Sequence, residues 1–197
     1  KVDNNFFNKE WVDKNIDLKP KLITANYMFA NIPNPIEFMK QCSRIMSEDS
    51  VLSVETGYHP MQFSKNMIDY IYHEHFFYFT IKSLKIMAEI CKLDLISVRQ
   101  NEHKGGSVEV DFVHKSSKIN KSFYLRDLYI NQESQIIEKY LSYFNKLDRE
   151  VSENIFKIKK YLKKFINKGG EVIAFGASHS TTTLLYLFDF KDMPIKF

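Results

Sequence analysis

The stretch KLITANYMFANIPNPIEFMKQCSRIMSEDSVLSVETG, residues 21–57, decides the fold class of this chain. The apolar run at 21–26 is typical of a buried strand, and the turn at 31–35 leads into apolar residues at helical spacing over 36–46. Residues 50–55 form a second apolar run, which Gly57 closes. Strand, helix and strand with short connections are typical of a βαβ unit, so we expect an α/β fold with parallel strands.

The residues that follow predict a helix and an antiparallel pair. Helical spacing over 81–91 begins after Thr80, whose hydroxyl suits an N-cap. Strands are predicted at 94–98 and 107–113, separated by the turn Lys104-Gly105-Gly106. Because this turn is short, we expect the last strand to be antiparallel to its neighbours.

The C-terminal part predicts a long helix and a second, separate sheet. Apolar residues recur every three or four positions over about 133–167, which indicates one helix of about 30 residues or two in line. Residues 171–175 then predict a strand that runs into a loop of small residues, with Ser180 opening another helix. We expect the strand at 171–175 to stay outside the first sheet.

Composition excludes several classes of protein. The chain has 197 residues, 44% of them hydrophobic, and a net charge of +4, which is globular and too weakly basic to argue for nucleic acid. Cys42 and Cys91 are too few for a disulfide framework or a four-thiolate zinc site. No apolar run approaches the roughly 20 residues of a membrane helix. With no signal peptide visible, we expect a cytoplasmic protein without membrane or nucleic-acid partners.

The segment Tyr72-His73-Glu74-His75 is the best candidate for chemistry. It lies among six aromatic residues between Tyr70 and Phe79. Histidine takes and gives protons near neutral pH, a neighbouring carboxylate can orient it, and aromatic walls exclude water. The two histidines are two positions apart, which does not suit a metal pair on a helix, and we expect no metal site. A buried histidine beside a core aromatic cluster is an equally probable interpretation.

A second candidate is the loop Gly176-Ala177-Ser178-His179-Ser180-Thr181. Small residues between a strand and a helix allow backbone amides to approach an anion, so the loop suits phosphate. It matches neither a dinucleotide fingerprint nor a P-loop, and an ordinary helix cap is the alternative. Asn26 follows the first strand, at the carboxyl end where open α/β sheets bind ligands.

Four segments together resemble the S-adenosylmethionine-dependent C-methyltransferases that act on nucleotide-activated keto-deoxysugars. They are ANYMFANIP at 25–33, IYHEHFFYFT at 71–80, HKGGS at 103–107, and the stretch from Gly176 to Leu185. The resemblance covers nearly the whole chain, and its Tyr-His-Glu-His segment is the most specific part.

The resemblance implies three parts in a complete enzyme. These are an N-terminal zinc module with four cysteines, a central class I methyltransferase domain with a Gly-rich loop, and a C-terminal Rossmann-like domain. The zinc module and the Gly-rich loop are absent from this sequence, so we expect a fragment of a longer chain that binds S-adenosylmethionine poorly by itself. The expected divisions are the C-terminal half of a methyltransferase domain at 1–115, a helical connector at 116–168, and the beginning of a second Rossmann-like domain at 169–197.

The resemblance also implies roles for individual residues. His75 would be the base, Glu74 would orient it, and Tyr72 would hydrogen-bond the sugar or the enolate oxygen. Asn26 and Tyr27 would contact S-adenosylmethionine. The substrate would contact Asn31, where the family has His, and a set in the second loop: Gly176, Ala177, Ser178, His179 and Thr181. The family often has Lys or Arg at Ser180, and His179 could replace that cation.

Two other functions stay open at this point. The chain could be a non-catalytic nucleotide-sugar or protein-binding module that lost its cofactor half. It could also be a sugar O-methyltransferase, since a histidine base serves that reaction equally well.

Overall fold

The computed structural model of this protein describes residues 2–137, 140–191 and 193–196. The chain divides into two compact units, each described here by itself. The first, which we term the sheet unit, comprises residues 1–65 and 74–136. The second, which we term the helix unit, comprises residues 66–73 and 137–197.

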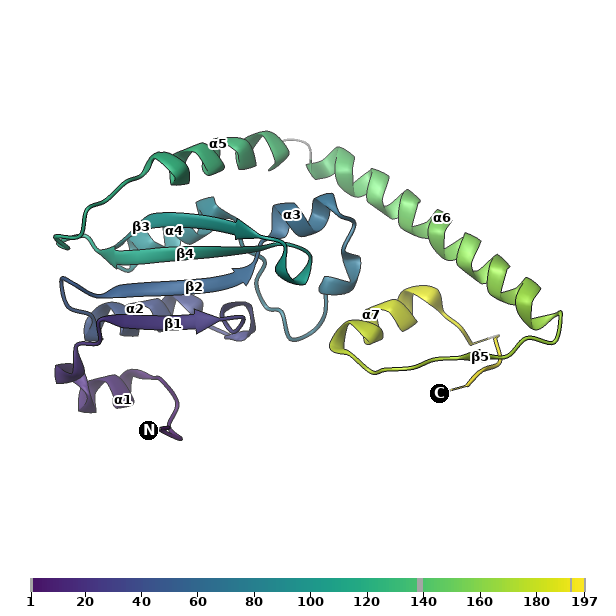
Figure 1. The fold of residues 1–197 in the computed structure, drawn as a ribbon, viewed down its shortest axis with the longest axis horizontal. Helices are drawn as coiled ribbons and strands as arrows, with labels where there is room; N and C mark the ends of the chain where they lie inside the picture. The colour runs from purple at the N-terminus through teal and green to yellow at the C-terminus, as the bar shows by residue number, and fades with distance from the viewer. Residues whose placement is uncertain (1, 138–139, 192, 197) are drawn as a thin grey trace. The chain divides into compact units, whose positions relative to one another are not determined.

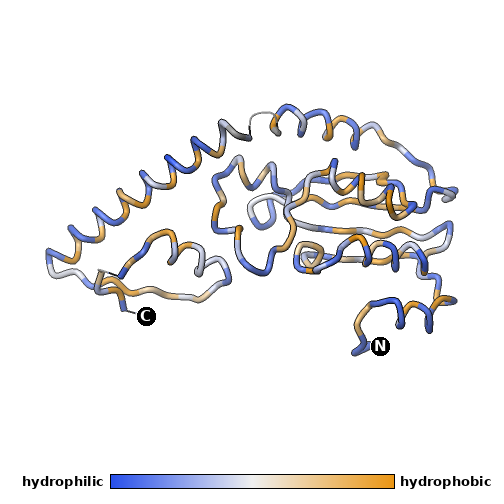
Figure 2. Tube along the Cα trace, turned by 180° about the vertical axis from the view of Figure 1, so that it is seen from behind, coloured by the Kyte–Doolittle hydropathy of each residue, from blue (hydrophilic) through white to orange (hydrophobic). Residues whose placement is uncertain are grey.

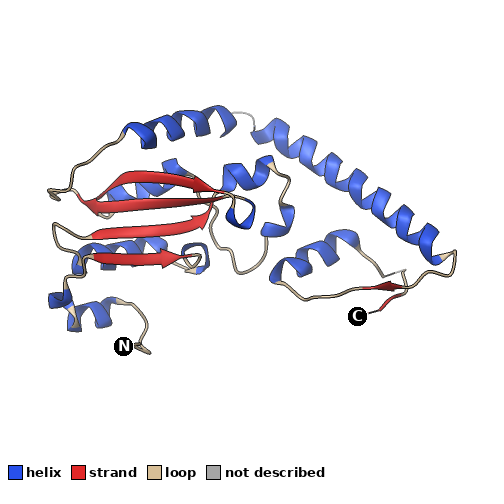
Figure 3. Ribbon diagram, in the orientation of Figure 1, coloured by secondary structure: helices blue, strands red, loops and turns tan. Residues whose placement is uncertain are grey.

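A four-stranded mixed sheet forms the centre of the sheet unit (Figure 3). Its order is β1-β2-β4-β3, with bounds Leu22–Asn26 for β1, Val51–Gly57 for β2, Ser107–His114 for β4 and Leu93–Asn101 for β3. β1 is parallel to β2, and β4 is antiparallel to both of its neighbours. The predicted strands, the βαβ unit and the antiparallel pair are therefore confirmed.

Helices α2 (Pro35–Ile45) and α4 (Ile81–Ile90) cover one face of this sheet (Figures 1 and 2). Burial alternates along β2, where Leu52 and Val54 point into the core while the residues between them are half-buried. This period of two is what a strand with one covered face requires. Met39 of α2 and Leu84 of α4 are fully buried against it.

The caps of these two helices follow from their sequences. The Asn34 side chain accepts from the Glu37 amide at 3.0 Å, and proline follows at the first helical position. The Thr80 hydroxyl accepts from the Ser83 amide at 3.0 Å, which confirms the predicted cap of α4. Two short helices, α1 (Lys9–Lys14) and α3 (His59–Ser64), were not predicted, because six residues are too few to show a helical period.

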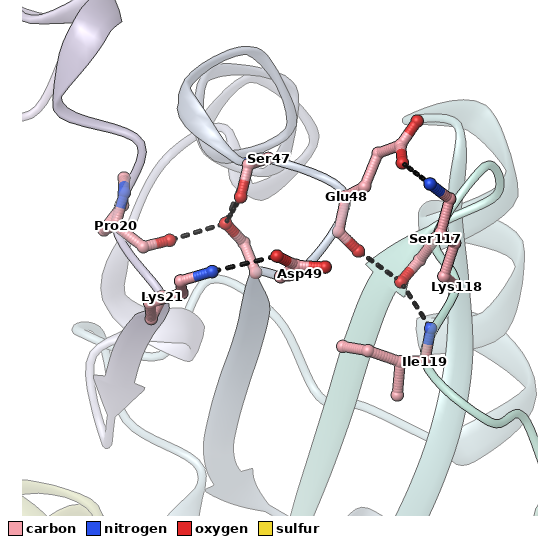
Figure 4. A network of polar contacts seen from close by, with 9 residues as sticks. Pro20, Lys21, Ser47, Glu48, Asp49, Ser117, Lys118 and Ile119 are labelled. Atoms are coloured by element: carbon pink, nitrogen blue, oxygen red, sulfur yellow. Dashed lines mark hydrogen bonds and ion pairs between the residues drawn. The ribbon is translucent and has the colours of Figure 1, made fainter.

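The amino-terminal edge of the sheet is closed by a network of polar contacts (Figure 4). The fully buried Ser50 hydroxyl donates to the Pro20 carbonyl, and Lys21 pairs with Asp49 at 2.9 Å. The Ser117 hydroxyl, three residues after the end of β4, donates to the Glu48 carbonyl. The strand ends at this edge are thus held by side chains as well as by the sheet itself.

The predicted long helix is present as two helices. They are α5 (Tyr124–Ile137) and α6 (Tyr140–Ile166), and the residues between them lie outside the described part of the chain. The first begins about nine residues earlier than the pattern indicated, at Tyr124 rather than near 133. Tyr129 and Ile130 of α5 pack against the core of the sheet unit. The boundary between the two compact units therefore lies near residue 136. The expected domain boundaries at 115 and 168 stay a prediction.

The helix unit contains α6, a small parallel sheet and one further helix. β5 (Val172–Ile173) pairs with β6 (Ile195–Lys196), and α7 (His179–Phe188) connects them. The strand predicted at 171–175 is shorter than expected and stays outside the first sheet, as expected. Hydrophilic and hydrophobic residues alternate along α6 at helical spacing (Figure 2). None of the helices in the described part of the chain combines the length and apolar character needed to cross a membrane.

Candidate functional site

A set of polar side chains lies at the carboxyl-terminal edge of the sheet, around Glu55. This residue is the third from the end of β2. Its Oε1 atom accepts from the Tyr27 hydroxyl at 2.8 Å and from the Asn101 side-chain amide at 3.1 Å. His103 Nδ1 lies 3.5 Å from the same oxygen. The turn after β1 and the residues around the end of β3, which are far apart in the sequence, therefore meet at one carboxylate.

The charge of Glu55 is stabilised by these neighbours. Burial acts to raise the pKa of its carboxyl, but the bonds from Tyr27, Asn101 and His103 together hold that pKa below its usual range. Burial is also the main cause that raises the pKa of the Tyr27 hydroxyl. Glu55 is consequently an anion and Tyr27 a neutral donor near neutral pH.

The turn after β1 is strained in a way that presents two predicted cofactor residues. Tyr27 has a φ of 52°, in the left-handed region, and its amide donates to the Glu55 carbonyl at 2.8 Å. Asn26, one residue earlier, is exposed at the end of the strand. Lys104 Nζ lies 3.8 Å from the centre of the Tyr27 ring. Hydrogen bonds and a cation–π contact thus fix the direction of this turn.

The segment that carries His75 is tied to the same edge. The Phe76 amide donates to the Ala30 carbonyl at 2.9 Å, which joins the segment to the turn after β1. His75 precedes Phe76 and Asn31 follows Ala30. The bond between Phe76 and Ala30 therefore brings these two predicted site residues near each other. His75 is half-buried, and its ring centre lies 6.1 Å from that of Tyr78, edge to face.

Tyr72 belongs to the other unit. Its ring stacks on that of His179 with 5.9 Å between centres and 17° between planes. The Thr183 hydroxyl of α7 donates to the Ile71 carbonyl at 2.6 Å. Within the helix unit, the start of α7 and the residues before His73 are therefore in contact, a neighbourhood that the sequence did not predict.

The predicted phosphate loop is exposed and rich in hydroxyl groups. Gly176 has a φ of 92°, which favours glycine at the turn from β5. The Ser178 amide donates to Thr181 Oγ1 at 3.0 Å, and Ser178 Oγ lies 2.9 Å from Ser180 Oγ. Ser178 is the N-cap residue, so α7 begins at His179, before the predicted opening at Ser180. Together with the exposed Ala177, these groups form the N-terminus of a ten-residue helix, where anions are favoured.

The predicted site residues fall into two sets. The sheet unit holds Asn26, Tyr27, Asn31, Glu74 and His75, of which Glu74 is half-buried. The helix unit holds Tyr72 together with the loop at 176–181.

Sequence reasoning missed Glu55, Asn101 and Ser107. Tyr27 Oη lies 3.2 Å from Ser107 Oγ, whose hydroxyl donates to the His103 carbonyl at 2.9 Å. The signal was available for Glu55, since it lies near the carboxyl end of a strand parallel to β1 and so must reach the same edge as Asn26. Over residues 2–137, 140–191 and 193–196, no group of three histidine, cysteine or acidic side chains could hold a metal ion.

Comparison with known proteins finds a family model that matches the C-terminal half of the chain. Residues 102–197 match the family model described as the C-methyltransferase C-terminal domain. C-methyltransferase NovU from Streptomyces niveus is 32% identical over 90 residues, which cover 46% of this chain and 21% of NovU. The chain therefore spans about a fifth of the length of that relative.

Solved structures give a weaker likeness. A protein described as a pericyclic reaction enzyme aligns with a TM-score of 0.42 and 14% identity, over 48% of this chain and 26% of its own. LepI in complex with SAM aligns with a TM-score of 0.40 and 13% identity, over the same shares. Scores this low carry no argument about function. The sequence match is the stronger finding: residues 102–197 are similar to the C-terminal domain of C-methyltransferases.

Proposed function

We propose that this chain takes part in transferring a methyl group from S-adenosylmethionine to the carbon beside the keto group of a nucleotide-linked keto-deoxysugar. The observation that carries the proposal is the family match over residues 102–197, joined to a half-buried histidine held at the carboxyl edge of an α/β sheet. C-methylation requires a carbanion equivalent, and a keto group makes the neighbouring C–H bond acidic enough for a side-chain base.

His75 acts as that base. Its imidazole takes the proton from the carbon beside the keto group, and the electrons of the broken C–H bond pass into the enolate of the sugar. With S-adenosylmethionine bound, the enolate carbon would form a bond to its methyl group as the bond from methyl to sulfur breaks, which would leave a neutral thioether. S-adenosylmethionine supplies this electrophilic methyl group when it is bound.

The other residues orient the reactants. Asn26 and Tyr27 would hold S-adenosylmethionine, and they suit it because one is exposed at a strand end and the other is fixed by Glu55. Glu74 tunes the base, and Tyr72 donates a hydrogen bond to the sugar or to the enolate oxygen. Asn31 contacts the sugar. Gly176, Ala177, Ser178, His179 and Thr181 would bind the phosphates.

Deuterium exchange on the sugar tests this proposal without a methyl donor. When a nucleoside-diphosphate 4-keto-deoxysugar is incubated with the intact protein in heavy water, the NMR signal of the proton beside its keto group should disappear. His75→Ala should abolish this exchange and lower kcat for methyl transfer by about 10²–10⁴-fold, while S-adenosylmethionine affinity stays nearly unchanged.

Two companion variants make the test specific. Tyr72→Phe should cost less, because only one hydrogen bond is lost. Normal turnover in His75→Ala, or loss of turnover in His73→Ala instead, would contradict the assignment. Methyl transfer to a sugar oxygen, with no exchange at carbon, would indicate an O-methyltransferase.

A further inference from the structure

Glu133 is a carboxylate that the proposed chemistry does not use, yet it is completely buried. It lies on α5 and has 0% of its surface exposed. Burying an ionisable side chain is costly unless strong partners compensate for the lost water. Its partners therefore indicate what it does.

Glu133 binds the first turn of α4 with both carboxylate oxygens. The Ile81 amide donates to Oε1 and the Lys82 amide donates to Oε2 at 3.0 Å. The next amide, that of Ser83, is bound by Thr80. The first amide groups of a helix have no acceptors within the helix, and these bonds supply them. A negative charge at this end also interacts favourably with the helix dipole.

A third bond reaches the edge of the sheet. The Tyr58 hydroxyl donates to the Glu133 carboxylate, and Tyr58 follows directly after β2. Tyr58 also forms a β-bridge with Phe79, and the Phe79 carbonyl accepts from the His59 amide at 3.2 Å. Glu133 therefore connects α5 both to the end of β2 and to the residues that follow His75.

These bonds define the path of the segment at 75–80. At its start, Phe76 is bonded to Ala30, and just beyond its end Ile81 and Lys82 are bonded to Glu133. Burial raises the pKa of the Glu133 carboxyl, and the amides of Lys82 and Ile81 and the Tyr58 hydroxyl act in the opposite direction. Removing the carboxylate would release one end of the segment while leaving the other attached.

We propose that Glu133 is a positioning residue for His75, which it acts on by fixing the Phe79–Lys82 backbone that continues from the histidine. This inference rests on the proposed function, because it assumes that His75 removes the proton. Displacing a reacting group by about 1 Å can cost about 10²-fold in rate, so a distant anchor can matter for turnover.

The test compares Glu133→Gln with Val113→Ala in the intact protein. Gln has nearly the same size as Glu but only one acceptor oxygen in place of two. Val113 is fully buried in β4, pairs with Asp94 and lies toward the amino edge of the sheet, away from the polar cluster. The thermal unfolding midpoints of the two variants are measured first, and assays are run well below both.

We expect Glu133→Gln to slow sugar proton exchange and kcat by about 10–100-fold, with S-adenosylmethionine affinity changed by less than about twofold. Amide hydrogen exchange in residues 76–82 should become faster. Val113→Ala should keep its exchange rate and kcat within about twofold of the wild type. Should Glu133→Gln fail to fold, Tyr58→Phe removes only the third bond and should give a smaller loss, about three- to tenfold, in the same direction.

Equal rates in the Glu133 and Val113 variants, or unchanged amide exchange in residues 76–82, would overturn the positioning role. This failure is distinguishable from failure of the proposed function. If His75→Ala keeps the wild-type exchange rate, the assignment of the base is wrong, and the Glu133 inference is overturned with it.

Discussion

The two compact units of this chain differ sharply in how they bury side chains. Among the described residues, the sheet unit contains every buried hydrophobic side chain except Leu147 of α6. In the helix unit, large apolar side chains of α6 such as Phe156 and Tyr161 are more than two thirds exposed. In the described part of the chain, the sheet unit therefore has the more tightly packed core, which suits it to hold the reacting base in place.

The candidate site residues follow the same division. In the sheet unit, Glu55 and Tyr27 are locked by several hydrogen bonds from different connections. In the helix unit, the bonds of Ser178 run to its close neighbours Ser180 and Thr181 in the loop. This contrast suits a fixed centre for proton transfer and an adaptable loop for a flexible phosphate group.

Core substitutions should break the comparison most strongly. Phe112→Ala in β4 removes a fully buried ring and should lower the unfolding free energy by about 3–5 kcal/mol. Phe156→Ala in α6 removes a ring that is 68% exposed and should change it by less than about 0.5 kcal/mol. Urea titration followed by far-ultraviolet circular dichroism, which reports on the helices of both units, measures both costs. Similar costs for the two variants would contradict the contrast in packing.

Two glycines should show the same contrast on a smaller scale. Gly106 has a φ of 141°, and a Cβ there would lie 2.7 Å from Met61 Cγ, so Gly106→Ala should cost about 3 kcal/mol. Gly176 has a φ of 92° with no atom within 4 Å of such a Cβ, so Gly176→Ala should cost only about 1 kcal/mol. Thermal unfolding midpoints measure both, and a larger fall for Gly176→Ala would be inconsistent with this packing.

His59 should make the sheet unit sensitive to acid. Burial lowers the pKa of its imidazole to about 4, so the folded protein binds its proton more weakly than the unfolded chain does. Its stabilising contribution is complete only well above pH 6.5 and is lost as the pH falls toward 4; because the ring is only partly buried, the loss at pH 5 should be about 1–2 kcal/mol. His59→Phe should remove this loss, measured by urea titrations at pH 7.5 and 5. An identical loss in the variant would assign the acid sensitivity to carboxylates.

Local sequence patterns were sufficient for the strands and for the start of α4. The alternation of apolar and polar residues along a strand shows which face of the sheet is covered. The Thr80 cap depends only on Ser83, three positions later in the sequence. The same reasoning placed the start of α5 too late. Tyr124 and Leu125 are exposed, so the first turn of that helix shows no apolar period.

The parts of the site that were missed depend on contacts between distant residues. Glu133 contacts amides that are more than fifty positions away, and Glu55 of β2 meets Asn101 of β3 across the strand between them, β4. No spacing rule reports such a meeting, because it exists only after the sheet order is known. His75 could be proposed because its neighbours in sequence are distinctive, but its link to Asn31 became visible only through the bond from Phe76 to Ala30.

The order β1-β2-β4-β3 has a consequence for grafting parts of this protein onto relatives. The family match begins at residue 102, just after β3 ends at Asn101 and before β4 begins at Ser107. A chimera joined there would take β3 from one parent and β4 from the other, although the two strands pair along most of their length. A junction near residue 137, after Glu133, would keep every strand of the sheet with its natural partner and is the better place to exchange modules.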